Sequence, residues 1–115
     1  MRNIDLKTEL NALGMPFKLI GYETKAPAYP YGIYLENINV SGADDEIPRR
    51  IVSHDVTIEL YHNTDDGLLT ACAILEAWLD SLPLDYRREM TYIPDENHLL
   101  ASYTMNYTTK KRKGD

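Results

Sequence analysis

The stretch "SHDVTIELYHNTDD", Ser53 to Asp66, holds two histidines and four carboxylates within fourteen residues. Its apolar members take every second position: Val56, Ile58 and Leu60. Alternation with a period of two is typical of a strand that has one buried face and one polar face. We therefore predict a strand over residues 51–61, with these three side chains in the core.

The same strand geometry separates the polar groups that resemble a metal or acid–base site. His54 and His62 would lie about 26 Å apart, because a strand rises about 3.3 Å per residue. The carboxylates of Asp55 and Glu59 share a face at about 13 Å, whereas paired-carboxylate glycosidases need at most about 9.5 Å. The stretch therefore predicts a strand that leads into a helix cap, with no metal site and no catalytic site.

After Asp66 the apolar period becomes helical, over residues up to about Ser81. Asp65 or Asp66 is expected to cap this helix and Pro83 to end it. The apolar stripe consists of Leu68, Ala71, Cys72, Leu75, Leu79 and Leu82, and it is widened by Ala73, Ile74, Ala77 and Trp78. Such a wide apolar surface predicts cover from the sheet and from a neighbouring subunit. Cys72 lies on the stripe, so we expect a buried, unreactive thiol with a raised pKa.

The other elements follow from caps, turn residues and alternation. They are a helix over residues 3–14 capped by Asn3, strands over 17–23 and 31–40, a polar connection over 41–50, and strands over about 85–93 and 98–109. One face of the last strand should hold Leu99, Ala101, Tyr103, Met105 and Tyr107. The order helix, three strands, helix, two strands predicts one α+β domain over residues 1–115, with a mostly antiparallel sheet.

Composition argues against several classes of function. The net charge of −6 argues against nucleic acid as the main partner. The single cysteine cannot form an intramolecular disulfide, and no leader or apolar run of about 20 residues is visible, so we expect a soluble intracellular protein without a membrane partner. No glycine-rich phosphate loop or nucleophile elbow is present, so we expect neither an enzyme nor a bound cofactor.

Tyrosine and the charged loop supply the candidate interaction residues. The chain has nine tyrosines against one phenylalanine and one tryptophan, and tyrosine suits edges and subunit interfaces. The loop around "ADDEIPRR" has an acidic and a basic end, which suits either a protein contact or a solvated loop. The candidate interface residues are Tyr29, Tyr31, Asp44, Asp45, Glu46, Arg49, Arg50, Trp78, Tyr103 and Tyr107.

The basic residues Lys110 to Lys113 leave two alternatives open. A cluster of one sign at a terminus can contact nucleic acid, and it can also form a flexible, solubilising tail, here over about 109–115. Because chain termini tend to be poorly ordered, we expect the tail and no direct binding of nucleic acid.

From about Tyr29 to Tyr107 the chain resembles the small tail-terminator, or tail-completion, proteins of long-tailed bacteriophages and prophages. The segments that carry the resemblance are "YPYGIYLEN", "HDVTIELYHNTDD" leading into "LLTACAILEAWLDSLPL", and "YRREMTYIPDENHLLASYTMNY". The resemblance implies a non-enzymatic virion protein, present in the host cytoplasm during assembly. It implies a homo-oligomeric, commonly hexameric ring that caps the tail tube and joins it to the head-completion proteins. The wide helix, the tyrosine-rich strand faces and the loop Ser41–Arg50 would then contact neighbouring protomers or tail and head proteins.

A different class of function stays open from the residues alone. The tyrosines and methionines of the last two strands could line a small-molecule pocket in a dimeric α+β domain. The lining residues would be Tyr86, Met90, Tyr92, Tyr103, Met105 and Tyr107.

Overall fold

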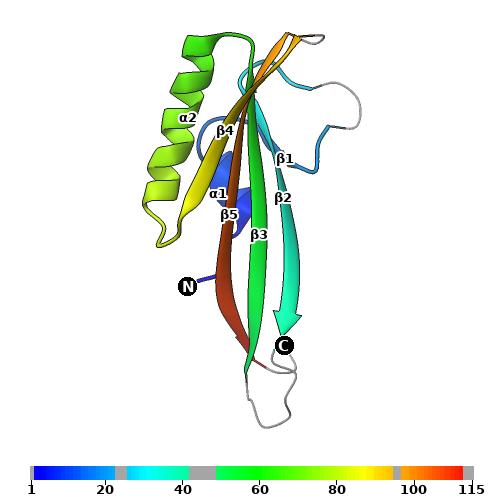
Figure 1. The fold of residues 1–115 in the computed structure, drawn as a ribbon, viewed down its shortest axis with the longest axis vertical. Helices are drawn as coiled ribbons and strands as arrows, with labels where there is room; N and C mark the ends of the chain where they lie inside the picture. Colours follow the sequence, from blue (N-terminus) through cyan, green and yellow to red (C-terminus); the bar gives the residue numbers. More distant parts are fainter. Residues whose placement is uncertain (1, 23–25, 42–48, 95–96, 113–115) are drawn as a thin grey trace.

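The computed structural model describes residues 2–22, 26–41, 49–94 and 97–112 (Figure 1). In chain order the elements are α1 (Leu6–Asn11), β1 (Phe17–Leu19), β2 (Tyr31–Ser41), β3 (Arg49–His62), α2 (Asp65–Asp80), β4 (Tyr86–Ile93) and β5 (His98–Arg112). This is the predicted order of helix, three strands, helix and two strands, so the α+β class is confirmed.

The strands form one sheet in the order β1-β2-β3-β5-β4. Strand β1 pairs parallel with β2, and the other neighbours pair antiparallel, as predicted for a mostly antiparallel sheet. Residues of α1, α2 and one face of the sheet belong to a single buried cluster, so we call that face the helix-covered face and the other the open face. The layered arrangement places the core between the helices and the helix-covered face.

The predicted core positions of β3 are confirmed, and the shared face predicted for β5 is the buried one. Val56, Ile58 and Leu60 are at most 2% exposed, and their neighbours across the ladder lie on the same face. On β5, Leu99 is partly buried and the four other residues of the predicted shared face are buried: Ala101, Tyr103, Met105 and Tyr107. Helix α2 contributes Leu68, Ala71, Cys72, Leu75 and Leu79 to the same cluster.

The caps of both helices differ from the sequence prediction. Helix α1 begins at Leu6, because the carboxylate of Asp5, and not Asn3, accepts a hydrogen bond from the backbone N–H of Thr8 at 3.3 Å. Helix α2 is capped by Thr64, whose hydroxyl accepts from the N–H of Gly67 at 3.1 Å. A β-branched threonine suits the extended backbone that follows β3. The two aspartates predicted as caps lie in the first turn of α2, where they complement the positive helix end: Asp65 and Asp66.

Strand β1 is shorter than the predicted strand over residues 17–23. The N–H of Gly21 bonds to the carbonyl of Leu19 at 2.7 Å, which closes a γ-turn centred on Ile20. The φ angles of Ile20 and Gly21 are 67° and 153°. The turn leads the chain away from β2 after three paired residues.

Strands β3 and β5 are longer than predicted. Residues 109–112, expected in a flexible tail, pair with β3 instead, and Lys110 lies opposite Ile51. The backbone ladder therefore overrides the repulsion expected within a basic run. Residues 113–115 lie outside the described part of the chain.

Strands β2, β3 and β5 extend beyond both helices to form what we call the distal arm (Figure 1). By register it consists of residues 37–41 of β2, 49–55 of β3 and 106–112 of β5. The arm contributes to the elongated shape of the molecule, which measures 54 × 30 × 23 Å.

Candidate interaction surface

The edge strand β2 carries β1 beside only its first half. The N–H of Gly32 bonds to the carbonyl of Pro16 at 2.9 Å, and the carbonyl of Tyr34 accepts from the N–H of Ile20 at 2.8 Å. Even-numbered residues of β2 therefore direct their backbone groups away from β3. Within the described residues no strand pairs with β2 beyond Tyr34 on the side that faces away from β3, so the backbone groups of residues 36, 38 and 40 form a free edge.

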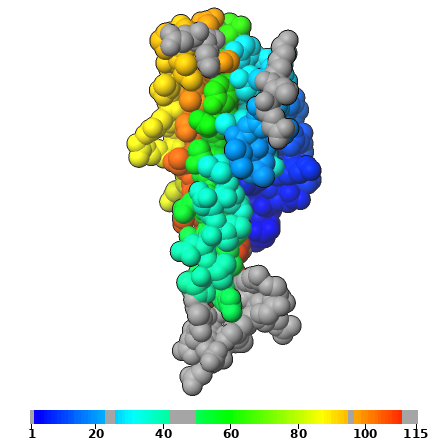
Figure 2. Space-filling model, turned by 90° about the vertical axis from the view of Figure 1, so that its right-hand side faces the viewer, coloured from blue at the N-terminus to red at the C-terminus, as the bar shows by residue number. Residues whose placement is uncertain are grey.

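The free part of β2, "LENINVS" from Leu35 to Ser41, lacks the usual protection of an edge strand. It holds neither lysine nor proline and a single charge, that of Glu36. Three of its apolar side chains are exposed by 41–56%: Leu35, Ile38 and Val40. Figure 2 looks onto this side of the molecule and shows β2 (cyan to teal) uncovered along the arm. An edge of this kind is a template for pairing with another strand.

The opposite edge of the sheet is β4, "YRREMTYI". Its middle six residues are all exposed, and Met90 and Tyr92 are the large apolar side chains among them, at 47% and 54%. Its charged residues form two ion pairs, one between Arg87 and Glu89 and one between Arg88 and Glu76 of α2. The free part of β2 and the edge strand β4 thus both expose apolar side chains.

The direction of the backbone groups at β4 follows from the ladder. Ile38 of β2 lies opposite His54 of β3, and His54 lies opposite Tyr107 of β5. The alternation of inward and outward backbone groups continues from β5 to β4. Because paired residues in a regular antiparallel ladder point both toward or both away from each other, Met90, opposite Ala101, directs its N–H and C=O away from β5. The outward backbone groups at both edges therefore belong to residues with side chains on the helix-covered face.

Helix α2 has the predicted second apolar surface. Leu69 is 51% and Ile74 41% exposed, and both lie away from the buried stripe. Trp78 is half-buried, and its Nε1 donates to Glu9 Oε1 of α1 at 3.3 Å. The indole thus connects the two helices, while Leu69 and Ile74 face solvent.

Tyr103, a candidate interface residue, lies in the core instead. Its side chain is fully buried, and its hydroxyl donates to Glu76 Oε2 at 2.7 Å. Burial and bonding to Cys72 and Glu76 raise the pKa of Tyr103. Burial also raises the pKa of Cys72, as predicted for an unreactive thiol. Tyr103 is therefore inaccessible to a neighbouring protein in this structure.

Tyr107 is buried too, where the helices meet the distal arm. Its hydroxyl accepts from the N–H of Ile4 at 3.3 Å, and its ring lies parallel to that of His54 at 4.3 Å between centroids. His54 is 2% exposed and contacts Glu36 Oε1 at 3.4 Å and Thr109 Oγ1 at 2.8 Å. The histidine weighed as a metal ligand in the sequence thus connects the three strands of the arm.

Tyr29 and Tyr31 belong to an aromatic cluster at the opposite end of the sheet. The ring of Tyr29 stacks on Tyr31 and on His62, each with 5.6 Å between centroids, and its hydroxyl lies 2.5 Å from His98 Nδ1. Tyr31 also stacks on Tyr61 at 5.1 Å and is buried. Of the two candidates, Tyr29 is the half-buried one, so it is the more accessible to a partner.

The charged loop is described only at its end. Asp44, Asp45 and Glu46 lie outside the described residues. Arg49 begins β3, and Arg50 is half-buried at the end of the arm. A contact through the acidic part of this loop stays a prediction.

The residues expected to line a small-molecule pocket separate into two groups. Tyr103, Met105 and Tyr107 fill the core and Tyr86 packs against it, partly buried, whereas Met90 and Tyr92 are exposed. The latter two border a depression of about 360 Å³ between the start of α2 and strands β4 and β5, together with Leu69. The six residues therefore do not surround one cavity.

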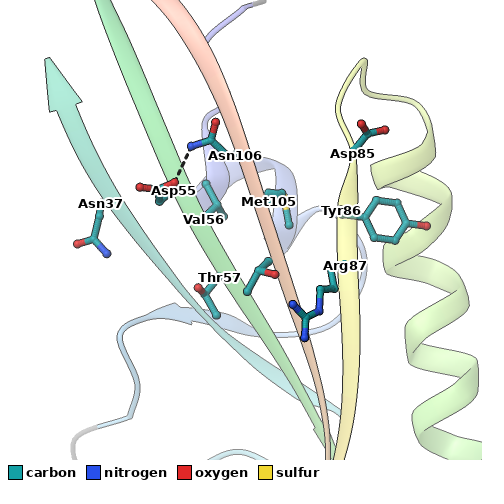
Figure 3. A pocket seen from close by; sticks show the side chains of 10 residues that line it. Asn37, Asp55, Val56, Thr57, Asp85, Tyr86, Arg87, Met105 and Asn106 are labelled. Carbon is teal, nitrogen blue, oxygen red and sulfur yellow. Dashed lines mark hydrogen bonds between the residues drawn. The ribbon is translucent and has the colours of Figure 1, made fainter. Parts of the chain in front are cut away.

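A larger depression of about 500 Å³ lies on the open face (Figure 3). Most of its lining residues carry polar groups: Asn37, Asp55, Val56, Thr57, Asp85, Tyr86, Arg87, Thr104, Met105 and Asn106. Asn106 Nδ2 donates to Asp55 Oδ1 at 2.5 Å, which is the dashed line in Figure 3. The polar groups are spread along four strands, with no nucleophile aligned with a base.

Two other kinds of site are absent from the described residues. Within residues 2–22, 26–41, 49–94 and 97–112, no three His, Cys, Asp or Glu side chains form a group that could hold a metal ion. In the same part of the chain, no helix is both long and apolar enough to cross a membrane.

Comparison with known proteins supports the fold. No protein-family model matches the chain, and no curated protein sequence matches it. A chain in a solved structure described as "Virion of native gene transfer agent (GTA) particle" superposes with a TM-score of 0.56 at 14% sequence identity. The match covers 94% of this chain and 86% of the other. The two chains thus share a fold.

Proposed function

We propose that the chain is a structural, non-enzymatic virion protein that forms a ring at the end of a phage tail tube and joins the tail to the head. The observation that carries the proposal is the fold shared, over 94% of the chain, with a chain of a gene transfer agent virion. The protein would function in the virion, after assembly in the host cytoplasm. Its partners would be copies of itself, the tail tube and head-completion proteins.

The distribution of apolar surface supports assembly with other chains. Exposed apolar side chains occur on β2, on β4 and on the outer face of α2, where a monomer would leave them in water. Ile74 on α2 is one of them, at 41% exposed. Burying such surfaces against neighbours is the usual driving force of a subunit interface.

Mass and shape of the purified protein test the proposal. We expect light scattering after size exclusion to give a concentration-dependent oligomer, and negative-stain microscopy to show closed rings, commonly of six copies. Isolated tail tubes that lack their terminal ring should recruit the protein to one end. A strictly monomeric mass at high concentration, with neither rings nor binding to tubes, would count decisively against the proposal.

A substitution on α2 tests whether this helix contributes to the ring. Ile74→Glu adds a charge at an exposed position, so it should leave the protomer folded and reduce ring formation. Thr104→Glu, at an exposed position of the open face, is the matched control. Equal ring formation by both variants would remove α2 from the interface without affecting the rest of the proposal.

A further inference from the structure

We infer that the free edge of β2 in one copy pairs with β4 of the next copy, so that neighbouring sheets join into one continuous sheet around the ring. The inference rests on the proposed function, because it names the surfaces through which the ring forms. The occupant of the free edge is thus a second copy of this chain.

Strand direction favours this pairing. Strands β2 and β3, β3 and β5, and β5 and β4 are each antiparallel, so β2 and β4 run in opposite directions. A rotation that does not invert the strands would therefore bring β2 of one copy and β4 of the next together antiparallel, which is the more stable arrangement per residue. Through the ladder Met90 is level with Gly32, six residues from Ile38, so pairing Ile38 with Met90 requires strands that are tilted to the ring axis, as in a closed barrel. Each copy uses one edge on either side, and such a head-to-tail contact closes into a ring when the rotation allows it.

The two edges also match in length and in the direction of their backbone groups. The free segment Leu35–Ser41 and the eight residues of β4, Tyr86–Ile93, are of nearly equal length. Ile38 and Met90 both direct their backbone N–H and C=O groups outward from the sheet edge, and both have their side chains on the helix-covered face. A pair with Ile38 opposite Met90 therefore satisfies both backbones and keeps the helices of both copies on the same side.

The side chains agree with this register. Setting Ile38 opposite Met90 places Leu35 opposite Ile93, which gives two apolar cross-strand pairs. Asn39 then lies opposite Glu89, and no residue of the free segment opposes a side chain of like charge. Pairing would cover the apolar side chains that β2 exposes along the arm.

A cysteine cross-link tests the register directly. The double variant Ile38→Cys with Met90→Cys places both new thiols at exposed positions, and the native Cys72 is buried. Since directly opposed residues in a ladder lie within disulfide reach, oxidation should give a ladder of covalent oligomers on a non-reducing gel. The control pair, Ile38→Cys with Thr104→Cys, puts the second thiol on the open face and should stay predominantly uncross-linked.

Variants of the two edges test, without a cross-link, whether β2 of one copy pairs with β4 of the next. Ile38→Lys blocks the β2 edge and Met90→Lys blocks the β4 edge, and each should raise the concentration needed for association about tenfold or more, which corresponds to about 1.4 kcal/mol. A mixture of the two should form a 1:1 dimer and nothing larger, because one intact β2 edge and one intact β4 edge remain.

Ile38→Pro removes only an outward N–H, so it should disrupt association while far-UV circular dichroism stays that of the parent.

The outcomes separate this inference from the proposed function. Rings that persist in both lysine variants, with no cross-link above the control, would overturn the edge pairing and leave the ring itself intact. Failure of the parent protein to form rings, together with failure of the Ile38→Cys, Met90→Cys variant to cross-link above its control, would overturn both. Larger oligomers in the mixture of lysine variants would show an interface other than β2 with β4.

Discussion

The hydroxyl of Tyr103, fully buried beneath α2, donates to the carboxylate of Glu76 at 2.7 Å, and Arg88 Nη1 donates to the same oxygen at 2.8 Å. Tyr103 lies on β5, Glu76 on α2 and Arg88 on β4, so one carboxylate connects the helix to two strands. A buried hydroxyl without a partner would be costly, and Glu76 removes that cost.

Tyr103→Phe is expected to reduce the free energy of unfolding by about 1–3 kcal/mol, because it removes a hydrogen bond to a charged acceptor while keeping the ring. Urea unfolding followed by circular dichroism measures the difference. Tyr92→Phe is the control, since that hydroxyl is exposed and bonds Asn97 at 3.4 Å. Equal losses in the two variants would show that the bond to Glu76 contributes nothing specific.

Stability should fall as the pH rises above 10. Partial burial and the bond to Asp80 raise the pKa of Tyr86 from 10.0 to about 12, and burial raises that of Tyr103. The folded state then holds protons that the unfolded state has released, so the contribution of both tyrosines is complete below pH 10 and is lost as the pH passes the folded pKa. Unfolding midpoints in urea between pH 9 and about 12 should decrease, and less steeply in Tyr103→Phe. A midpoint independent of pH over this range would contradict the expected shifts.

Local signals in the sequence predicted the elements well. The alternation of Val56, Ile58 and Leu60 identified β3 because side chains alternate between the faces of any strand. The cap of α2 was wrong by one or two positions, because Thr64, Asp65 and Asp66 are all good caps and the backbone that leaves β3 selects among them.

Pairing across the chain could not be predicted in the same way. Tyr103 was expected at an interface and is buried instead. Helix α2 covers this part of β5 and places Glu76 at the tyrosine hydroxyl, and how α2 crosses the sheet is not visible in the local sequence pattern. The free edge of β2 was also missed, although "LENINVS" holds no lysine or proline. That signal becomes informative only once the order β1-β2-β3-β5-β4 is known.

Gly32→Ala should destabilise the protomer by about 1–3 kcal/mol through overpacking. A Cβ at this position would lie 2.3 Å from Cε1 of Phe17 and 3.0 Å from the carbonyl oxygen of Glu59. The side chain of Phe17 would have to leave its place beside β2. Thermal unfolding measures the loss, and the double variant Gly32→Ala with Phe17→Leu should lose less than the sum of the single variants. Strict additivity would contradict a direct clash.

Trp78, the single tryptophan, should report the protonation of Glu9. The bond to Arg2 lowers the pKa of Glu9 below 4.5, burial opposes the shift, and the bond from Trp78 Nε1 contributes in the same direction as Arg2. A carboxyl group with a lowered pKa stabilises the fold above its ordinary pKa, and that contribution is lost as the pH falls through the folded value. Acid titration should therefore shift Trp78 emission in a step below pH 4.5, before the far-UV circular dichroism changes.

Two variants assign that step. Glu9→Gln keeps an oxygen acceptor for the indole and cannot titrate, so the step should disappear. Arg2→Gln removes the largest cause of the lowered pKa, so the step should move to higher pH. An unchanged emission step in Glu9→Gln would show that another group controls the environment of Trp78, and that the contact between α1 and α2 does not depend on the charge of Glu9.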